Sequence, residues 1–212
     1  MQRRHGAVED IHALVARRFA DERFASVLDV GCGEGELARH LPEGTWTGVD
    51  SSTEMLARAP APTVRADACA LPFADGSFDA VALLYVLYHL QEPVRALREA
   101  HRVLRAGGLL AAAAPSRHDA PELAFVLSQA PLTFDAEAAP SVLGEVFAEV
   151  EIERWDAPLL TLPTSRAVRD FLVGKGVEPA RADEAASTTP VPLTVTKRGA
   201  LAFARKPRHP SG

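Results

Sequence analysis

Acidic residues and glycines gather around position 30 in a pattern that could bind a ligand containing a nucleoside. Residues 27–35 read Val-Leu-Asp-Val-Gly-Cys-Gly-Glu-Gly, and Asp50 closes the next apolar run, Thr-Gly-Val-Asp. Glycines in such a turn let the backbone approach a ligand closely, because no Cβ intervenes. An acid at the end of the following strand can accept hydrogen bonds from two ribose hydroxyls. These residues therefore predict a site for an adenosine-containing cofactor.

Asp29 favours one cofactor over another. Nicotinamide enzymes and S-adenosylmethionine enzymes both combine a glycine turn with an acid at a strand end. A carboxylate inside the strand, at Asp29, would repel a pyrophosphate, whereas it can face the amino group of a bound methionine. The dinucleotide spacing Gly-x-Gly-x-x-Gly is also incomplete, because Glu36 stands in place of the third glycine. We therefore predict S-adenosylmethionine as the cofactor, with a nicotinamide dehydrogenase as the disfavoured alternative.

A second group of residues, at the end of a later apolar strand, could contact a methyl acceptor. Residues 84–90 read Leu-Tyr-Val-Leu-Tyr-His-Leu and contain both tyrosines of the chain. Ligands of open α/β sheets bind beyond the carboxyl ends of the strands, which places Tyr85, Tyr88 and His89 at the predicted reaction pocket. His89 is the candidate general base. A structural role for His89, and simple packing of the two tyrosines, are the open alternatives.

A polar run after the next strand, Pro-Ser-Arg-His-Asp at 115–119, adds His118 as a candidate contact for an acidic or phenolic acceptor. A nucleophilic triad of Ser116, His118 and Asp119 is excluded, because side chains two and three positions apart on a loop rarely align as nucleophile, base and orienter. Histidines and cysteines show no ligand spacing, so no metal is predicted.

Alternating strands and helices are expected to position these residues. Apolar runs and helical spacing predict strands at 26–31, 45–50, 63–67, 78–84 and 108–114, and helices at 8–21, 35–41, 52–58 and 92–104. Such alternation implies right-handed crossovers and a Rossmann-like, doubly wound α/β sheet. Gly107-Gly108 is expected to end the helix at 92–104, where a positive φ is wanted.

The second half of the chain departs from this alternation. The predicted elements are a short helix at 140–148, a strand at 150–155 that could continue through Leu159-Leu160, a helix near 167–172, a loop rich in Pro, Ala and Thr, and a last strand near 194–204. We expect a mostly parallel sheet with an antiparallel last strand and a helical insertion before it. The insertion then leaves the sheet at its active-site edge, and with the loop at 115–140 it is expected to roof the acceptor.

A single domain is predicted for residues 1–212. Its expected parts are a leading helix segment (1–25), a cofactor-binding half (26–115), a substrate-side half (116–206) with a lid (161–193), and a tail (207–212).

Composition bears on partners and location. The chain has 212 residues, 47% of them hydrophobic, and a net charge of −5. This acidic balance argues against a nucleic-acid partner, because phosphate binding normally needs a basic face. No run approaches the roughly 18 apolar residues of a membrane helix, the first residues lack the apolar core of a secretion signal, and two cysteines make no disulfide framework. We expect a cytoplasmic monomer or homodimer that has no membrane partner and acts on a small-molecule methyl acceptor.

Four motifs occur in order along residues 26–115. They are the glycine turn; the strand ending at Asp50; the run Arg65-Ala66-Asp67-Ala68 with Leu71-Pro72-Phe73 and Asp75-Gly76-Ser77-Phe78-Asp79 after it; and Glu99 with Arg102-Val103-Leu104-Arg105-Ala106-Gly107-Gly108. Together they resemble the class I S-adenosylmethionine-dependent methyltransferases, most closely the type 11 small-molecule branch. Ala106 departs from that family, which usually has proline before its double glycine. This position shapes a turn, so the departure leaves the chemistry untouched.

The resemblance implies roles for single residues. It places the turn at the methionine end of the cofactor, Asp50 at the ribose, and residues near 67 at the adenine. Cys32 is expected to fill space in the crowded turn and not to act as a nucleophile. The implied cofactor contacts are Asp29, Gly31, Cys32, Gly33, Asp50, Ser51, Met55, Asp67, Ala68 and Leu84. The implied function is methyl transfer to an O or N atom of a small-molecule metabolite. The alternatives are an RNA- or protein-modifying methyltransferase and a non-catalytic regulatory protein that binds S-adenosylmethionine.

Overall fold

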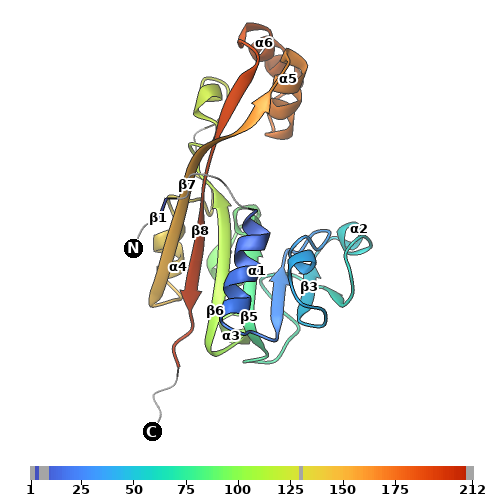
Figure 1. The fold of residues 1–212 in the computed structure, drawn as a ribbon, viewed down its shortest axis with the longest axis vertical. Helices are drawn as coiled ribbons and strands as arrows, with labels where there is room; N and C mark the ends of the chain where they lie inside the picture. Colours follow the sequence, from blue (N-terminus) through green and yellow to red (C-terminus); the bar gives the residue numbers. More distant parts are fainter. Residues whose placement is uncertain (1–2, 5–9, 129–130, 209–212) are drawn as a thin grey trace.

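The structure is a computed structural model that describes residues 3–4, 10–128 and 131–208. Its centre is an eight-stranded sheet in the order β1-β7-β8-β6-β5-β2-β3-β4 (Figure 1). The strands are β1 (Arg3–Arg4), β2 (Val27–Val30), β3 (Trp46–Asp50), β4 (Thr63–Arg65), β5 (Phe78–Leu84), β6 (Leu104–Pro115), β7 (Glu149–Leu162) and β8 (Leu193–Arg205). Only β8 runs antiparallel to its neighbours among the described strands. The predicted Rossmann-like, doubly wound fold with an antiparallel last strand is confirmed, and β1 is an additional strand that the sequence did not reveal.

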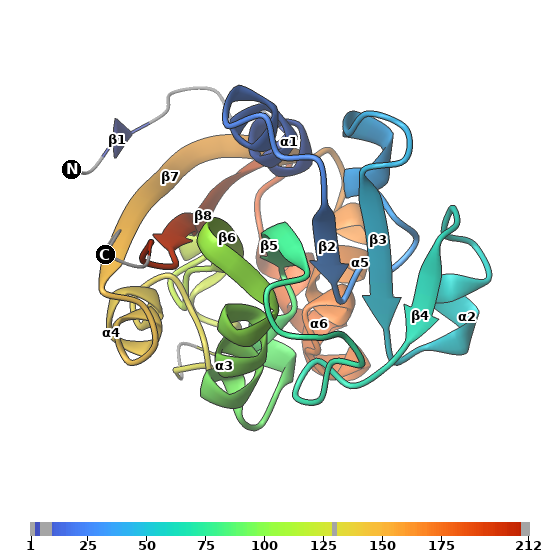
Figure 2. The same ribbon diagram turned by 90° about the horizontal axis from the view of Figure 1, so that it is seen from below.

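Helices cover both faces of the sheet because its central strands are apolar on both sides. Figure 2 shows α1 (Ile11–Asp21) on one side, and α3 (Pro93–Val103) and α4 (Ala139–Gly144) on the other. Alternate residues of β5 point to opposite faces, so Ala80 and Ala82 pack in the α1 layer while Val81 and Leu83 pack in the α3 layer. The strand ends that carry the predicted site residues are therefore held by two separate cores.

Several predicted helices differ from the observed ones. The helices predicted at 52–58 and 140–148 are shorter, Thr53–Leu56 and Ala139–Gly144. The helix expected at 35–41 is a single 3-10 turn, η1 (Leu37–His40), because the glycine turn extends further than the spacing indicated. The helix expected to end at Gly107-Gly108 ends at Val103, and Leu104 already has the extended backbone of β6. Gly107 has a φ of +83° inside this strand, and its N–H donates to the Lys206 carbonyl at 2.9 Å.

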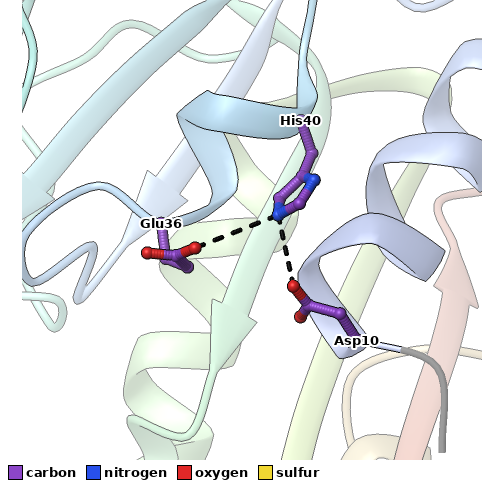
Figure 3. Close-up of side chains that lie close together, drawn as sticks. All are labelled: Asp10, Glu36 and His40. Carbon is purple, nitrogen blue, oxygen red and sulfur yellow. Dashed lines mark ion pairs between the residues drawn. The ribbon is translucent and has the colours of Figure 1, made fainter.

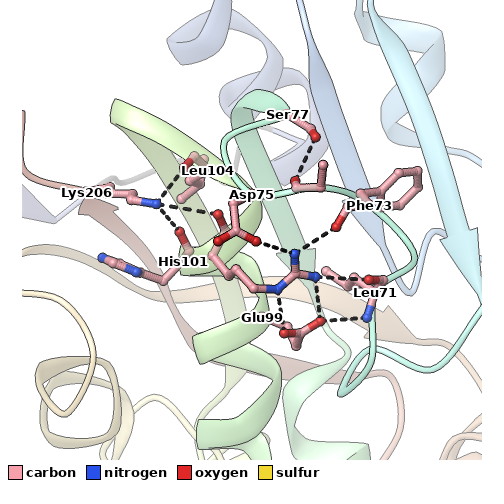
Figure 4. Close-up of polar contacts among 10 residues, drawn as sticks. Leu71, Phe73, Asp75, Ser77, Glu99, His101, Leu104 and Lys206 are labelled. Atoms are coloured by element: carbon pink, nitrogen blue, oxygen red, sulfur yellow. Dashed lines mark hydrogen bonds and ion pairs between the residues drawn. The ribbon is translucent and has the colours of Figure 1, made fainter.

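The loop between β4 and β5 is fastened to α3 by Arg102 (Figure 4). The Arg102 guanidinium donates to the carbonyls of Leu71 and Phe73 and contacts the carboxylates of Asp75 and Glu99 at 2.7–3.0 Å. These contacts explain why the motif around residues 71–79 accompanies the motif around residues 99–108. Both motifs therefore stabilise the packing of this loop against α3.

A long hairpin carries two helices beyond the sheet. Figure 1 shows β7 and β8 continuing past β6 to α5 (Ser165–Gly174) and α6 (Pro179–Thr188). The sequence predicted a loop where α6 lies. Pro179 at the first helical position and the Glu178 carboxylate, which accepts from the Arg181 N–H at 3.1 Å, start this helix.

The helix pair has a hydrophobic core of its own. Val168 and Leu172 of α5 pack with the buried alanines of α6 and with Leu123 and Val126, which lie in the segment after β6. The two segments expected to roof the acceptor, 115–140 and 161–193, are therefore in direct contact. No helix in the described part of the chain is long and apolar enough to cross a membrane.

Candidate functional site

The glycine turn after β2 contains two positions with different surroundings. Gly33 has a φ of +54°, and a Cβ built on it would meet nothing within 4 Å. Gly31 has a φ of +70°, and a Cβ there would lie 2.4 Å from Cγ2 of Val86. Gly31 is therefore needed for packing against the segment after β5, whereas the open space above Gly33 is where a ligand can approach the backbone.

Asp50 at the end of β3 is bound to this turn. Its Oδ2 accepts from the Gly33 N–H at 3.0 Å, and its Oδ1 accepts from the Ser52 N–H at 2.8 Å. A carboxylate has about four lone-pair sites, so each oxygen can still accept a hydroxyl. Asp50 is half-buried. Its position fits two ribose hydroxyls while it also braces the turn.

Asp29 is a buried acid in the middle of β2, with a side chain that meets Trp46. The residue is 3% exposed, and its Oδ2 accepts from Nε1 of Trp46 at 3.1 Å. Gly48, its register partner in β3, leaves room for the indole to reach it. Burial raises the pKa of Asp29 to about 7, although the indole N–H lowers it, and Asp50 raises it further. A cation bound next to Asp29 would stabilise the carboxylate.

The sequence prediction missed Trp46, although its spacing from Asp29 is set by the β2–β3 register.

Cys32 lies beside this pair and is 8% exposed. Burial, together with Asp29 and Asp50, raises the pKa of its thiol to about 12. A thiol with this pKa is no nucleophile at neutral pH, in agreement with a filler role.

The residues expected at the adenosine lie at the ends of β3 and β4. Ser51 is exposed, Ala68 is half-buried, and Met55 on α2 (Thr53–Leu56) is 38% exposed. The Asp67 carboxylate accepts from the Cys69 N–H at 2.8 Å and so supports its own turn. These four residues are accessible, as contacts to a nucleoside require.

The leading helix is tied to the segment after the glycine turn by three side chains (Figure 3). Nε2 of His40 lies 3.3 Å from a carboxylate oxygen of Asp10 and 4.0 Å from one of Glu36. Asp10 also caps α1 by accepting from the His12 N–H at 2.9 Å. Within the described part of the chain, the ligand atoms of these three residues lie close enough together to hold a metal ion. Their contacts with one another already account for the cluster as a link between α1 and η1.

The end of β5 carries the residues predicted for the acceptor side. Leu84 is 8% exposed, and Tyr85 follows it with a φ of +60°, which is uncommon for a residue other than glycine. Burial, with smaller effects of Tyr88, Asp119 and Asp10, raises the pKa of Tyr85 to about 12. Tyr85 is therefore a neutral phenol at physiological pH.

Tyr88 and His89 line a pocket of about 520 Å³ beyond the ends of β5 and β6. Both residues lie in η2 (Leu87–His89), and the centroids of their rings are 4.2 Å apart. His89 is exposed. The pocket wall also includes Leu132, Lys175 and residues near the end of β6. The structure thus brings the tyrosine–histidine pair together with the segment after β6 and with the turn that follows α5.

His118, the predicted acceptor contact, and its neighbour Arg117 differ in their position relative to the pocket. Nη2 of Arg117 lies 2.8 Å from Oδ1 of Asp135, and its backbone N–H donates to Glu137 at 3.0 Å. Arg117 lines the pocket but is already paired, while His118 is exposed and is not among the lining residues. Asp119 and Lys175 line the pocket instead. Asp119 belonged to the polar run noticed in the sequence, but no local signal marked Lys175.

The sequence is similar to those of known methyltransferases. Residues 28–112 match the methyltransferase domain family of type 11. Trans-aconitate 2-methyltransferase of Deinococcus radiodurans is 37% identical over 123 residues, which are 55% of this chain and 46% of that protein. Malonyl-[acyl-carrier protein] O-methyltransferase of Pseudescherichia vulneris is 35% identical over 129 residues, which are 54% of this chain and 51% of that protein. The chain thus spans about half the length of these curated relatives.

Solved structures show the same fold. The YcgJ protein of Bacillus subtilis superposes with a TM-score of 0.66 at 19% identity, and the match covers 94% of this chain and all of that one (100%). The matched residues include the glycine turn, Asp50, β5, the Tyr88–His89 pair and most of β6. Residues 28–112 thus match the type 11 methyltransferase family, and the relatives that align with this chain are named methyltransferases.

Proposed function

We propose that this protein transfers a methyl group from S-adenosylmethionine to an O or N atom of a small-molecule acceptor. The observation that carries the proposal is the open turn at Gly33, which follows the strand next to β5 and lies beside Asp50, together with the acceptor-sized pocket lined by Tyr88 and His89 after β5. The relatives named above are methyltransferases, and one of them is named for the small molecule trans-aconitate.

The residues at the glycine turn fit this cofactor. Gly33 leaves space against the backbone, and Asp50 has acceptor capacity left for two ribose hydroxyls. Among the described residues, Trp46 donates a hydrogen bond to Asp29, and no cation is paired with this buried carboxylate; a methionine amino group that reached it would supply a positive charge. Asp67 and Ala68 would contact the adenine edge, and Ser51 and Met55 would lie beside the adenosine.

Methyl transfer from a sulfonium requires little chemistry from the protein itself. When bound, the sulfonium supplies an electrophilic methyl group, whose bond to sulfur breaks as a bond to the acceptor forms. The pocket walls align the acceptor and exclude water, which is the main part of the catalysis. Tyr85 is a neutral phenol that can donate a hydrogen bond but is no base at physiological pH. His89 is the candidate that accepts a proton from a protonated acceptor, because its ring is accessible at the pocket.

We further propose a division of labour along the chain. Residues 26–115 would bind the cofactor, residues 116–206 the acceptor, and residues 161–193 would act as the lid. The packing of α5 and α6 on the segment around Leu123 supports the lid, because this segment continues into the pocket wall.

The test compares alanine substitutions at two glycines that both have a positive φ. Gly33→Ala and Gly44→Ala both place a Cβ in open space at a positive φ, +54° and +79°. Each is expected to cost roughly 1–2 kcal/mol in the free energy of unfolding. Gly33→Ala should in addition weaken binding of S-adenosylhomocysteine by at least tenfold, while Gly44→Ala should leave it unchanged, as measured by isothermal titration calorimetry.

Turnover is measured with radiolabelled methyl donor on carboxylic, phenolic and amine metabolites, and on bulk RNA and protein. Methyl transfer to a metabolite supports the proposal. Transfer to RNA or protein alone would replace the small-molecule acceptor by a macromolecule, and cofactor binding without transfer to any of these would indicate a regulatory protein. Equal affinities of the two alanine variants would place the cofactor elsewhere.

A further inference from the structure

Lys175 reaches the acceptor pocket from the lid. It is the residue after α5, and its side chain is 36% exposed. It lines the pocket together with Tyr88, Asp119 and Leu132. Burial raises the pKa of Tyr88, and the positive charge of Lys175 opposes this shift, so the ammonium lies within electrostatic reach of that phenol.

Lys175 shares a single carboxylate with a second lysine. Oδ2 of Asp119 accepts from Nζ of Lys175 at 2.9 Å and also from Nζ of Lys197, while its Oδ1 accepts from the Arg198 N–H at 2.9 Å. Asp119 is 8% exposed. Both ammonium groups lie over the ring of Phe171, at 5.8 Å and 5.7 Å from its centroid. One buried negative charge therefore faces two positive charges.

The surplus charge is not cancelled by other lining residues. Arg117, the other cation of the pocket wall, is paired with Asp135 at 2.8 Å and with Glu137. The Glu137 carboxylate also accepts from Ser116 and lines the neighbouring pocket that contains Arg154 and Arg198. Lys175 can leave Asp119 at small cost, because Asp119 keeps Lys197 and the Arg198 N–H.

We propose that the acceptor is an organic acid, and that Lys175 binds its carboxylate in this pocket while Asp119 remains paired with Lys197. One surplus positive charge matches one carboxylate. A phosphate dianion carries nearly two negative charges, so one surplus positive charge would leave much of its charge unmatched. The carboxylate anchored at Lys175 leaves the remainder of the acceptor to lie along Leu132 and Tyr88, with its methylated atom toward His89. This assignment rests on the proposed function for the identity of the site, but its binding test does not.

The test uses matched acids and amides. Isothermal titration compares 4-hydroxybenzoate with 4-hydroxybenzamide, and butyrate with butyramide, on the full-length protein with and without S-adenosylhomocysteine; phenyl phosphate is the competing anion. In the wild type, each acid should bind at least tenfold more tightly than its amide. Lys175→Met keeps the apolar stem and should weaken the acids by about 10- to 100-fold, as expected for loss of a charged hydrogen bond, without changing the amides.

Three further variants separate anchoring from folding. Lys175→Arg should restore most of the preference for acids. Lys197→Met should also remove it, because Lys175 then becomes the sole lysine partner of Asp119. Arg166→Met deletes a charge on an 89% exposed side chain of α5, the helix that precedes Lys175, and should have no effect.

Three results would each overturn the proposal. The first is equal affinity of the wild type for acids and amides, and the second is tighter binding of phenyl phosphate than of either acid. The third is an equal loss of affinity for acid and amide in Lys175→Met. Methyl transfer to neutral acceptors that is insensitive to Lys175→Met would leave the proposed function intact and reject the anchor. An acid preference without any binding of S-adenosylhomocysteine would support the anchor and reject the function.

Discussion

Asp29 is the residue in which the electrostatics of the cofactor site are concentrated. It is buried in a central strand, has Trp46 as its hydrogen-bond donor, and lies near a second acid, Asp50. A buried carboxylate in this setting destabilises the protein when it ionises, and binding of a cation beside it offsets that cost. Ligand binding and folding stability should therefore depend on the same proton.

The first prediction concerns stability against pH. Because the folded-state pKa of Asp29 is raised from 3.8 to about 7, its contribution favours the folded state fully below pH 4. That contribution is lost as the pH rises through 7, by at most about 4 kcal/mol. Asp29→Asn keeps an oxygen for Trp46 and removes the titration. Urea denaturation at pH 5 and pH 8 should therefore show a smaller pH effect in the variant than in the wild type.

The same substitution should separate folding from binding. Asp29→Asn should weaken S-adenosylhomocysteine at pH 8 by about tenfold or more, since a charged hydrogen bond to the amino group is lost. An identical pH effect in wild type and variant would show that another group titrates, and unchanged affinity would place the methionine amino group away from Asp29.

The prediction at the scale of elements concerns α3 and the loop before β5. Arg102→Ala would leave the Leu71 and Phe73 carbonyls and the Glu99 carboxylate without the guanidinium. We expect a loss of about 2–3 kcal/mol in the free energy of unfolding, measured by urea titration. Arg95→Ala is the matched control on the same helix, because Arg95 is 59% exposed and lies 3.6 Å from Glu92. Equal effects of the two variants would contradict the clamp.

The elements that the sequence predicted well are those with one dominant signal. The strands β2, β3, β5 and β6 are buried apolar runs, and α1 and α3 have clear apolar faces. α6 was missed because its buried residues are alanines, which give a weak periodic signal. Gly107 was misassigned because a positive φ suits both a helix end and an irregular strand.

The candidate site could be predicted only where neighbours lie close in sequence or in register. The glycine turn, Asp50 and the Tyr88–His89 pair follow from strand ends. The contact between Lys175 and Asp119 joins positions 56 residues apart. It depends on how the hairpin bends over the segment after β6, which no local pattern encodes. The packing of Val86 against Gly31 is of the same kind.

At the scale of the whole molecule, the sheet and the lid should be separable. Leu162 and Leu193 are register partners at the base of the lid, so an Asn-Gly turn can replace residues 163–192 and close the hairpin. The same variant carries Leu123→Ser and Val126→Ser, so that the surface uncovered by removal of the lid is less apolar. S-adenosylhomocysteine affinity should stay unchanged, while methyl transfer should be abolished.

Circular dichroism and urea titration are the controls for an intact sheet in this truncated protein. Retained methyl transfer would show that the lid is dispensable. Loss of cofactor affinity in a folded truncated protein would show that the lid belongs to the donor side and not to the acceptor side.

The outer edge of the sheet has a consequence for self-association. Among the described residues, β1 pairs with β7 only at Glu153 and Arg154, which leaves most of the outer edge of this 14-residue strand without a partner strand. Glu149, Glu151 and Glu153 repeat at every second position, and Pro158 lacks an amide hydrogen. A second molecule that tried to extend the sheet here would meet repeated negative charge and a missing donor. The longest strand of the fold thus carries its own protection against fibre-like stacking.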